Sequence, residues 1–170
     1  SVALGNPTEG ALLLWLREQG VDYQQMRNEV EIVDELPFST ERKYMATLVR
    51  SALLPNKTIL YVKGATDIIQ QFCTSLANNT SWDEIFAQLQ TWQNKAMRTL
   101  GFAYLELPEA VATDLSTGII AKIMNGETDI ATDFCFLGTV AIADPVRKEV
   151  PAAVKECIDA GISVKIVTGD

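Results

Sequence analysis

The chain has 170 residues, of which 48% are hydrophobic and 21% charged, a composition typical of a folded globular protein rather than a disordered or low-complexity one. Its 14 basic and 22 acidic side chains give a formal net charge of −8, which argues against general affinity for nucleic acids or anionic membranes. Histidine is absent, so imidazole-based catalytic triads and histidine-ligated zinc are excluded.

Cysteine usage and hydropathy narrow the class of protein further. Cys73, Cys135 and Cys157 are far apart and show no CxxC spacing, which predicts neither a disulfide framework nor a thiolate metal site and is typical of a reducing compartment. No run of about 18 apolar residues and no signal peptide is present, so we expect a soluble chain. Because the sequence begins with Ser1 and stops at Asp170, directly after an apolar segment, we interpret it as part of a longer protein.

The N-terminal part of the chain carries a helix signature. Asn6 can cap the helix, and Pro7 follows at its first position. Glu9 stands three residues after the cap, as in a capping box, and Gly20 ends the helical pattern. Alternating and β-forming residues then predict three strands, the last two joined by a turn at 55–57: residues 29–36, 43–54 and 58–62.

The rest of the chain alternates between helical and strand-like patterns. Thr66 is expected to cap a short helix that ends near residue 76, and Ser81 forms a capping box with Glu84 before a longer helix. Residues 108–133 are mostly interpreted as a variable loop. The other patterns predict strands at 100–107 and 134–143, helices near 119–124 and at 149–160, and a parallel strand at 163–167.

Residues 42–63 form a basic window in this acidic chain. The window carries no carboxylate and has a local charge of +5 over 22 residues, from Arg42, Lys43, Arg50, Lys57 and Lys63. On two antiparallel strands these side chains can face one pocket and bind an anion, although a solvated basic face of a hairpin explains the pattern equally well.

The neighbours of this window add the other groups that a nucleotide needs. Phe38 precedes it and Met45 lies inside it, while Lys63 and Gly64 stand beside the expected helix start at Thr66. An aromatic ring, an ammonium group and free backbone N–H groups suit a base with a phosphate tail. Neither GxxxxGK[ST] nor GxGxxG occurs, so no standard nucleotide fingerprint supports the hypothesis.

Five stretches in order resemble one family, the cytosolic part of the P-type ATPases, which are ATP-driven cation pumps. The stretches are GNPTEGAL at 5–12, FSTERKYM at 38–45, YVKGA at 61–65, MRTLGFAY at 97–104, and a fifth running from ADPVR at 143–147 through AGI at 160–162 to TGD at 168–170. The Asp-Pro-Val-Arg and Pro-Thr-Glu forms look most like calcium pumps of the plasma-membrane type and their bacterial relatives.

The resemblance implies an α/β (α+β) fold in two parts. Residues 1–143 would form the nucleotide-binding domain, a twisted antiparallel sheet flanked by helices. Residues 144–170 would be the hinge and the first strand-helix-strand piece of a Rossmann-like phosphorylation domain. The expected hinge residues are Asp144, Pro145 and Arg147, and the expected phosphorylation-domain elements are Thr168, Gly169 and Asp170.

The resemblance also assigns roles at the nucleotide site. Phe38 would stack on adenine, Lys63 would line the bottom of the pocket, and Gly64 would let the backbone approach the ligand. Lys43 and Arg98 would meet the ribose and the phosphates. The structural alternatives are a core or edge position for Phe38, an exposed strand-end position for Lys63, and for Arg98 a solvated position at the end of the preceding helix.

Three further residues are assigned with alternatives. Glu9 would lie near the adenine amino group, a role that competes with the capping box, and we favour the adenine role because Asn6 can cap alone. Met45 and Leu100 would supply apolar walls, although such residues are more often plain core. The family usually has proline and an acid where Thr66 and Asp67 stand, but a cap at Thr66 would preserve the geometry.

The implied activity is ATP binding for phosphoryl transfer, with Mg²⁺ as the cofactor in the whole pump. The family's phosphoryl acceptor lies in an Asp-Lys-Thr-Gly-Thr motif, and no aspartate of this chain precedes Lys-Thr, so the chain should bind ATP without hydrolysing it. Stacking and a few phosphate contacts predict a Kd near or somewhat below about 1 mM. No metal ligands are predicted within the chain.

The implied partners are ATP and the remaining phosphorylation, actuator and transmembrane domains of a pump, with this domain at the cytoplasmic face of a membrane. Neither nucleic acid nor direct membrane contact is expected. Two alternatives stay open. A haloacid dehalogenase-class phosphatase needs an Asp-x-Asp loop, which this sequence lacks. A non-catalytic adapter domain would use the basic hairpin to bind an acidic protein and would show no dependence on adenine.

Overall fold

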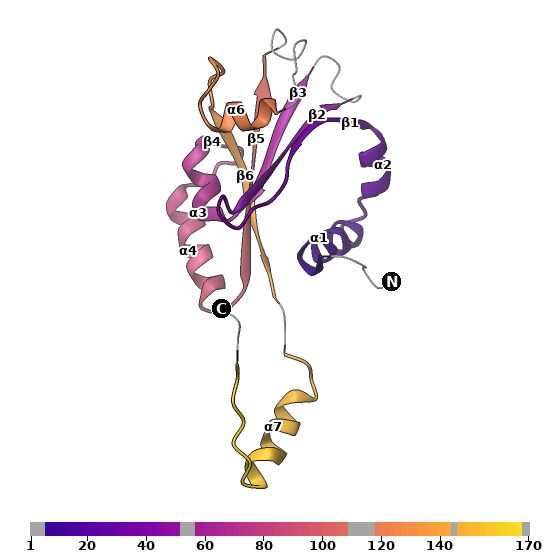
Figure 1. Ribbon diagram of the computed structural model, residues 1–170, viewed down its shortest axis with the longest axis vertical. Coiled ribbons are helices and arrows are strands. Elements are labelled where there is room, and N and C mark those ends of the chain that lie inside the picture. The colour runs from indigo at the N-terminus through magenta and orange to yellow at the C-terminus, as the bar shows by residue number, and fades with distance from the viewer. Residues whose placement is uncertain (1–5, 52–56, 109–117, 144–145, 168–170) are drawn as a thin grey trace.

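A computed structural model describes residues 6–51, 57–108, 118–143 and 146–167. Six strands form one sheet in the order β1-β2-β3-β5-β6-β4, antiparallel except for the parallel pair of β4 and β6 (Figure 1). The strands are β1 Val30–Leu36, β2 Tyr44–Ser51, β3 Thr58–Gly64, β4 Cys73–Leu76, β5 Arg98–Leu107 and β6 Phe134–Ile142. The predicted α/β architecture, a largely antiparallel sheet flanked by helices, is confirmed.

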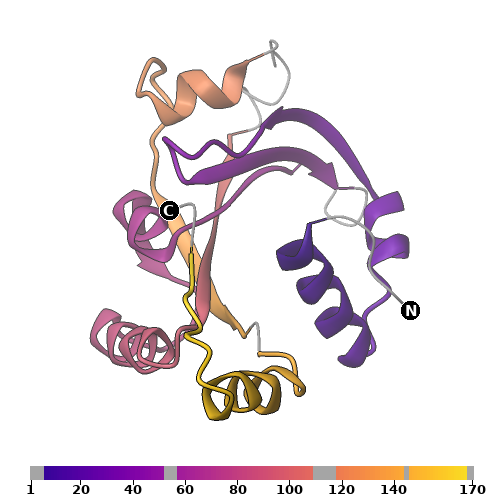
Figure 2. The ribbon, with the colours of Figure 1, turned by 60° about the horizontal axis from the view of Figure 1, so that its bottom comes forward.

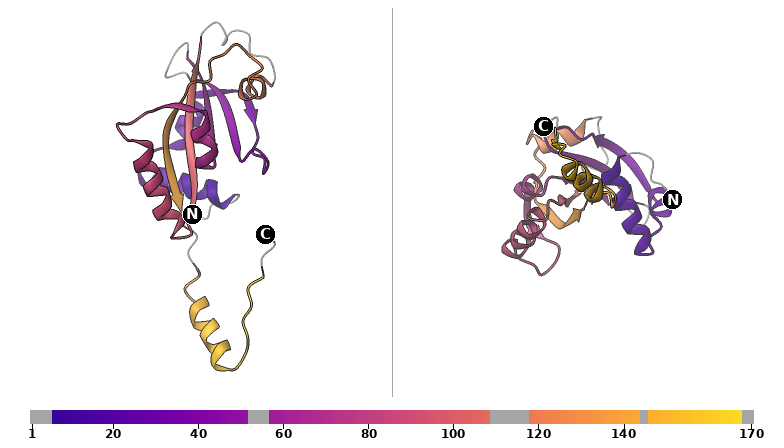
Figure 3. Two further views of the ribbon diagram at one scale, coloured as in Figure 1. Left: turned by 90° about the vertical axis from the view of Figure 1, so that its left-hand side faces the viewer. Right: turned by 90° about the horizontal axis from the view of Figure 1, so that it is seen from below.

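Helices lie on both sides of this sheet. They are α1 Pro7–Glu18, α2 Tyr23–Asn28, α3 Thr66–Ile69 with the 3₁₀ turn η1 Gln70–Phe72, α4 Trp82–Gln93, α6 Ile119–Met124 and α7 Val150–Asp159. Figure 2 shows α3, α4 and α6 along the outer side of a curved sheet, with α1 inside the curve. In Figure 3, α7 and the segment after it lie apart from the sheet and the other helices.

One face of the sheet forms the hydrophobic core. Successive side chains of a strand point to opposite faces, so every second residue of β2, β3, β5 and β6 is buried beneath α3, α4 and α6. The largest fully buried side chains include Phe134 and Phe136 of β6, Leu48 of β2 and Leu60 of β3. The opposite face, towards α1, is therefore available for other roles.

Local capping signals correctly predicted several helices. The Asn6 side chain accepts a hydrogen bond from the Thr8 amide at 3.0 Å and caps α1. Both halves of the capping box of α4 are present: Ser81 N donates to Glu84 Oε2 at 2.8 Å, and Glu84 N donates to Ser81 Oγ at 3.3 Å. The helices predicted near 119–124 and at 149–160 are also confirmed as α6 and α7.

The expectation for residues 66–76 is wrong in two respects. Thr66 is the first residue of α3 rather than its cap, and its hydroxyl lies 3.0 Å from that of Thr139 on β6. The helix ends within two turns, because residues 73–76 form β4 and pair with β6. Pairing with an available strand edge outweighs the local helical pattern, as tertiary context commonly does.

One further expectation, the parallel strand at 163–167, is wrong, and one short helix was not expected. Residues 163–167 are extended but form no strand, because no strand among the described residues pairs with them. The side chains of Ile166 and Val167 are about 90% exposed. The short helix α2 was not predicted. Asp22 caps it by accepting hydrogen bonds from the amides of Gln24 and Gln25. Of the expected turn at 55–57, residues 55 and 56 lie outside the described ranges.

The reactivity of Cys73 should show the effect of burial on a thiol. Cys73 Sγ donates to the Ile69 carbonyl at 3.2 Å, and burial, with a smaller contribution from nearby Cys135, raises the pKa of Cys73 to about 11. Because the thiolate is the nucleophile, we expect alkylation of Cys73 by iodoacetamide to be slow at pH 8 and to increase up to about pH 11. Peptide mass spectrometry measures this profile, with Cys73→Ser as the blank. A plateau already reached near pH 9 would contradict the expectation.

Candidate functional site

A row of three side chains crosses the sheet face that is turned towards α1. Met45 of β2 is paired with Lys63 of β3, and Lys63 is paired with Phe102 of β5, so the three side chains lie side by side. They line a cavity of about 270 Å³ together with Thr47, Tyr61 and Leu137. The cavity therefore combines one ammonium group with aromatic and aliphatic walls.

Helix α1 faces this row. Leu12 and Trp15 of α1 line a second cavity of about 320 Å³, and Phe102 and Leu137 border both cavities. The residues around the second cavity are almost entirely apolar. The site is thus a space between one helix and the exposed sheet face rather than a hole in the core.

An ion pair ties α1 to the site. Lys63 Nζ lies 3.3 Å from Glu9 Oε1, and the two side chains are 26% and 53% exposed. The local conflict over Glu9 is thereby resolved: Asn6 caps α1, and the Glu9 carboxylate reaches Lys63. Glu9 contacts the cavity residue Lys63, and its contact with adenine remains a prediction.

Removal of this ion pair should change stability little. Partly exposed pairs are screened by water and typically contribute about 0–1 kcal/mol. We therefore expect Glu9→Gln to change the free energy of unfolding by less than about 1 kcal/mol in urea denaturation. Glu18→Gln, at the exposed end of the same helix, is the matched control. A loss above about 2 kcal/mol for Glu9→Gln alone would show that the pair holds α1 in place.

The end of the β2–β3 pair at which β2 begins and β3 ends has an unusually close backbone contact. A Cβ atom added to Gly64 would lie 2.4 Å from the Lys43 carbonyl oxygen and 2.6 Å from Tyr44 Cβ. The same Lys43 carbonyl accepts a hydrogen bond from the Ala65 amide at 3.0 Å. Lys43 itself has a φ of 59°, in the left-handed region that non-glycine residues rarely adopt. Only glycine fits at position 64, and it fixes where the Lys43 backbone lies.

Phe38 lies in the loop that leads from β1 to Lys43. Its side chain is 58% exposed, so the alternative of a core phenylalanine is wrong. The loop is held by hydrogen bonds from Arg42 Nη2 to the Pro37 carbonyl at 2.9 Å and from Lys43 N to the Ser39 carbonyl at 2.8 Å. More than half of the Phe38 side chain is therefore accessible to a ligand.

Arg98 and Leu100 lie on β5 before Phe102. Alternation along the strand places all three on the face towards α1. Arg98 is the first residue of β5 and pairs with Ile142, so the alternative at the end of the preceding helix is wrong, since α4 ends at Gln93. Four residues of strand separate Arg98 from Phe102, a distance of about 13 Å. Arg98 could therefore meet only a part of a ligand that is remote from Lys63.

The basic window does not converge on one pocket. Arg50 pairs with Glu31 at 3.1 Å, and Lys57 pairs with Glu106 at 2.9 Å. Both lie at the opposite end of the hairpin from Lys63, because Arg50 pairs in register with Thr58. Acidic residues on β1 and β5, distant in sequence, neutralise this end, and a charge count within one window cannot detect them.

The structure brings together only some of the predicted residues. Met45 and Lys63 line the cavity, Glu9 contacts Lys63, and Lys43 and Gly64 lie at the adjoining end of the β2–β3 pair. The sequence analysis missed six cavity residues: Thr47, Tyr61, Val62, Phe102, Ala103 and Leu137. Alternation could have found two of them, because Tyr61 stands two residues from Lys63 and Phe102 two residues from Leu100.

Other predicted positions lie away from the cavity or cannot be described. Arg147 is exposed just before α7, where its carbonyl accepts a hydrogen bond from the Val150 amide at 3.0 Å. The expected positions Asp144, Pro145, Thr168, Gly169 and Asp170 lie outside the described residues. Within the described ranges, no group of three or more Cys, Asp or Glu side chains is arranged to hold a metal ion.

The fold and the site together define a class of binding domain: an antiparallel sheet whose free face, under one helix, offers a lysine among flat apolar walls. A family model described as "P-type ATPase, cytoplasmic domain N" matches residues 2–149. The chain therefore belongs to this family of P-type ATPase cytoplasmic domains, and the resemblance inferred from sequence motifs is confirmed.

Proteins with similar sequences include calcium-transporting ATPases. Over 98% of its length, the chain is 35% identical to the calcium-transporting ATPase PAT1 of Dictyostelium discoideum and 32% identical to the human plasma membrane calcium-transporting ATPase 4. It is 31% identical to a calcium-transporting ATPase of Bacillus subtilis. The chain spans only 14% of the first two proteins and 18% of the third.

Proposed function

We propose that this chain is the ATP-binding domain of a calcium-transporting P-type ATPase and holds the adenine end of ATP in the cavity at Lys63. The observation that carries the proposal is the row of Met45, Lys63 and Phe102, in which one ammonium group stands between apolar walls beside an open space. This combination suits a flat base linked to a charged tail.

The positions of the basic residues indicate how ATP would be oriented along the sheet. Lys43 and Arg98 both lie on the side of the row where β2 and β5 begin. Phosphates would therefore extend towards that end, with the base over Lys63 and Phe38 stacking on it. Gly64 and Leu100 lie on the path between the two ends. Glu9, now paired with Lys63, would turn towards the adenine amino group when ATP binds.

Phosphoryl transfer from ATP would need the other domains of the pump. Mg²⁺ bound to the phosphates of ATP would neutralise their charge during phosphoryl transfer, and this domain would contribute binding and orientation. Residues 1–143 would be the nucleotide-binding domain. Residues 144–170, with a hinge at Asp144, Pro145 and Arg147, would begin the phosphorylation-domain segment that ends at Thr168, Gly169 and Asp170. The acceptor aspartate, the actuator domain and the membrane domain would lie elsewhere in the pump.

In such a pump, this domain would lie at the cytoplasmic face of the membrane. In the part of the chain that the structure describes, no helix is long and apolar enough to cross a bilayer.

The adapter alternative is weakened because glutamates already neutralise Arg50 and Lys57. The match to the P-type ATPase family also argues against the alternative of a haloacid dehalogenase-class phosphatase.

Calorimetric titration of the whole chain tests the proposal. ATP should bind with a Kd near or below about 1 mM, and AMP should retain part of this affinity because the base contributes to binding. Inorganic triphosphate carries the charge of the tail without the base, so it should bind at least about fivefold more weakly. Equal affinity for ATP and inorganic triphosphate would overturn the proposal and favour a general anion site.

A further inference from the structure

A second row of side chains lies next to the lysine row and forms the far end of the cavity. Thr47 of β2 pairs with Tyr61 of β3, and Tyr61 pairs with Tyr104 of β5. Thr47 and Tyr61 line the same cavity as Lys63. The two rows are separated by two residues of strand, about 7 Å, a step that a purine ring can bridge.

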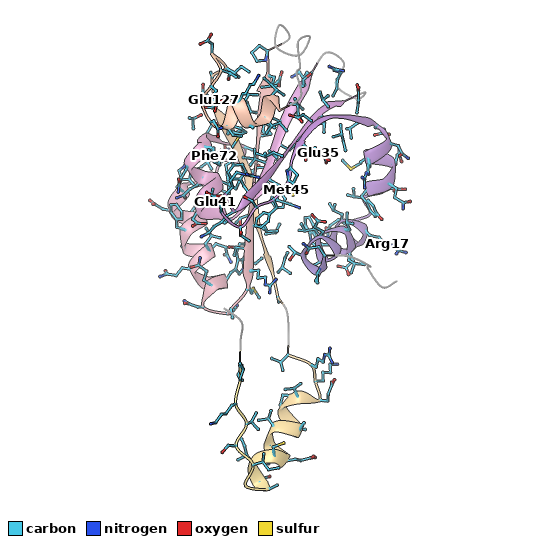
Figure 4. All side chains as sticks on the ribbon, viewed as in Figure 1. Arg17, Glu35, Glu41, Met45, Phe72 and Glu127 are labelled. Carbon is cyan, nitrogen blue, oxygen red and sulfur yellow. The ribbon has the colours of Figure 1, made fainter. Side chains whose placement is uncertain are left out.

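The positions of the basic residues indicate which part of a bound nucleotide would contact the row of Thr47 and Tyr61. Lys43 and Arg98 lie on one side of Lys63, whereas Thr47 and Tyr61 lie on the other. Figure 4 shows Met45 beside the loop between β1 and β2, in which Glu41 lies, and Glu35 farther from that loop on β1. A ligand with its phosphates near Arg98 would therefore point the distal edge of its base towards Thr47 and Tyr61.

The hydroxyl groups of Thr47 and Tyr61 are available for a ligand. Among the described residues, neither hydroxyl has a hydrogen-bond partner. Glu35 stands opposite Thr47 on β1, on the same face, and its exposed carboxylate also has no partner among the described residues. The other cavity walls near them, Met45, Phe102 and Leu137, are apolar. The polar groups at this end are therefore few and distinct from Lys63.

We propose that Thr47 and Tyr61 determine specificity for the base, with their hydroxyl oxygens accepting hydrogen bonds from the 6-amino group of adenine. This inference rests on the proposed ATP-binding function. A hydroxyl group can accept a hydrogen bond from an amino group. One such hydrogen bond between protein and ligand changes the affinity by about three- to tenfold. Phe38 and Lys63 would bind any base, whereas Thr47 and Tyr61, together with Glu9 at the other row, would distinguish adenine from a base that lacks the amino group.

Binding of two nucleotides to four proteins tests the inference. The ligands are ATP and purine riboside triphosphate, which lacks the 6-amino group, and the proteins are the unmodified chain, Thr47→Val, Tyr61→Phe and the double variant. The unmodified chain should prefer ATP by about three- to tenfold, and the double variant should lose most of this preference, because only Glu9 would then face the amino group. Affinity for purine riboside triphosphate should change by less than about twofold in every variant.

Tyr104→Phe is the matched control, because Tyr104 belongs to the same row but does not line the cavity. It should keep the preference for ATP, and thermal unfolding checks that every variant is folded. If the double variant keeps the preference, or if the unmodified chain has none, the inference is wrong while ATP binding stands. If ATP binds no better than inorganic triphosphate, the proposed function itself is wrong.

Discussion

Replacing Gly64 with alanine should lower the free energy of unfolding by about 2–3 kcal/mol and the melting temperature by about 5–10 °C. The new methyl group would lie 2.4 Å from the Lys43 carbonyl oxygen and 2.6 Å from Tyr44 Cβ. Neither neighbour is the flexible end of a side chain, so the two strands must separate. Because Lys43 adjoins the loop of Phe38, ATP affinity should fall as well.

Gly126→Ala is the matched control for this change. Gly126 has a φ of 70°, and nothing lies within 4 Å of an added Cβ, so only backbone strain opposes alanine there. Its cost should be about 1 kcal/mol, with ATP affinity unchanged. Thermal and urea unfolding compare the two variants, and ATP titration compares their binding. Equal stability losses for Gly64→Ala and Gly126→Ala would contradict the close contact at Gly64.

Phe38→Ala should weaken ATP binding by about 5- to 20-fold without loss of stability. The ring is 58% exposed and lies outside the core, so folding does not depend on it. Stacking contributes about 0.5–1.5 kcal/mol beyond the area buried against the base, and both contributions would disappear. Calorimetric titration measures the affinity, and Phe38→Trp should restore most of it.

Phe86→Ala provides the control for Phe38. Phe86 is also an exposed phenylalanine, at 42%, but it lies on α4 and stacks on Trp82, on the opposite side of the sheet. It should leave ATP affinity unchanged. A similar loss of affinity in both phenylalanine variants would show that the effect does not come from stacking at Phe38.

Signals that act over a few residues predicted the local structure well. The cap at Asn6 and the capping box of Ser81 and Glu84 each involve groups within three residues of each other, and both form as expected. The errors concern pairing partners. Residues 73–76 become β4 because the edge of β6 is free, and residues 163–167 form no strand because no partner lies beside them. The sequence of one segment does not reveal whether another strand will lie beside it in the folded sheet.

The residues that line the cavity could be predicted only in part. Motif order identified Lys63 and Met45, which line the cavity, and Phe38, which is exposed as stacking requires. Register across β2, β3 and β5 adds Phe102 and Tyr61, and register depends on the whole sheet. Charge counting failed for Arg50 and Lys57, because their carboxylate partners come from β1 and β5.

Mapping of backbone amide shifts during an ATP titration is the most direct test of where the nucleotide binds. The largest shifts are expected on the sheet face towards α1 and in the loop before β2: Phe38, Met45, Thr47, Tyr61, Lys63 and Phe102. AMP should reproduce the shifts near the base but not those near Arg98. Shifts concentrated around Arg50 and Lys57, or along α4, with none at Lys63, would contradict a nucleotide site on this face.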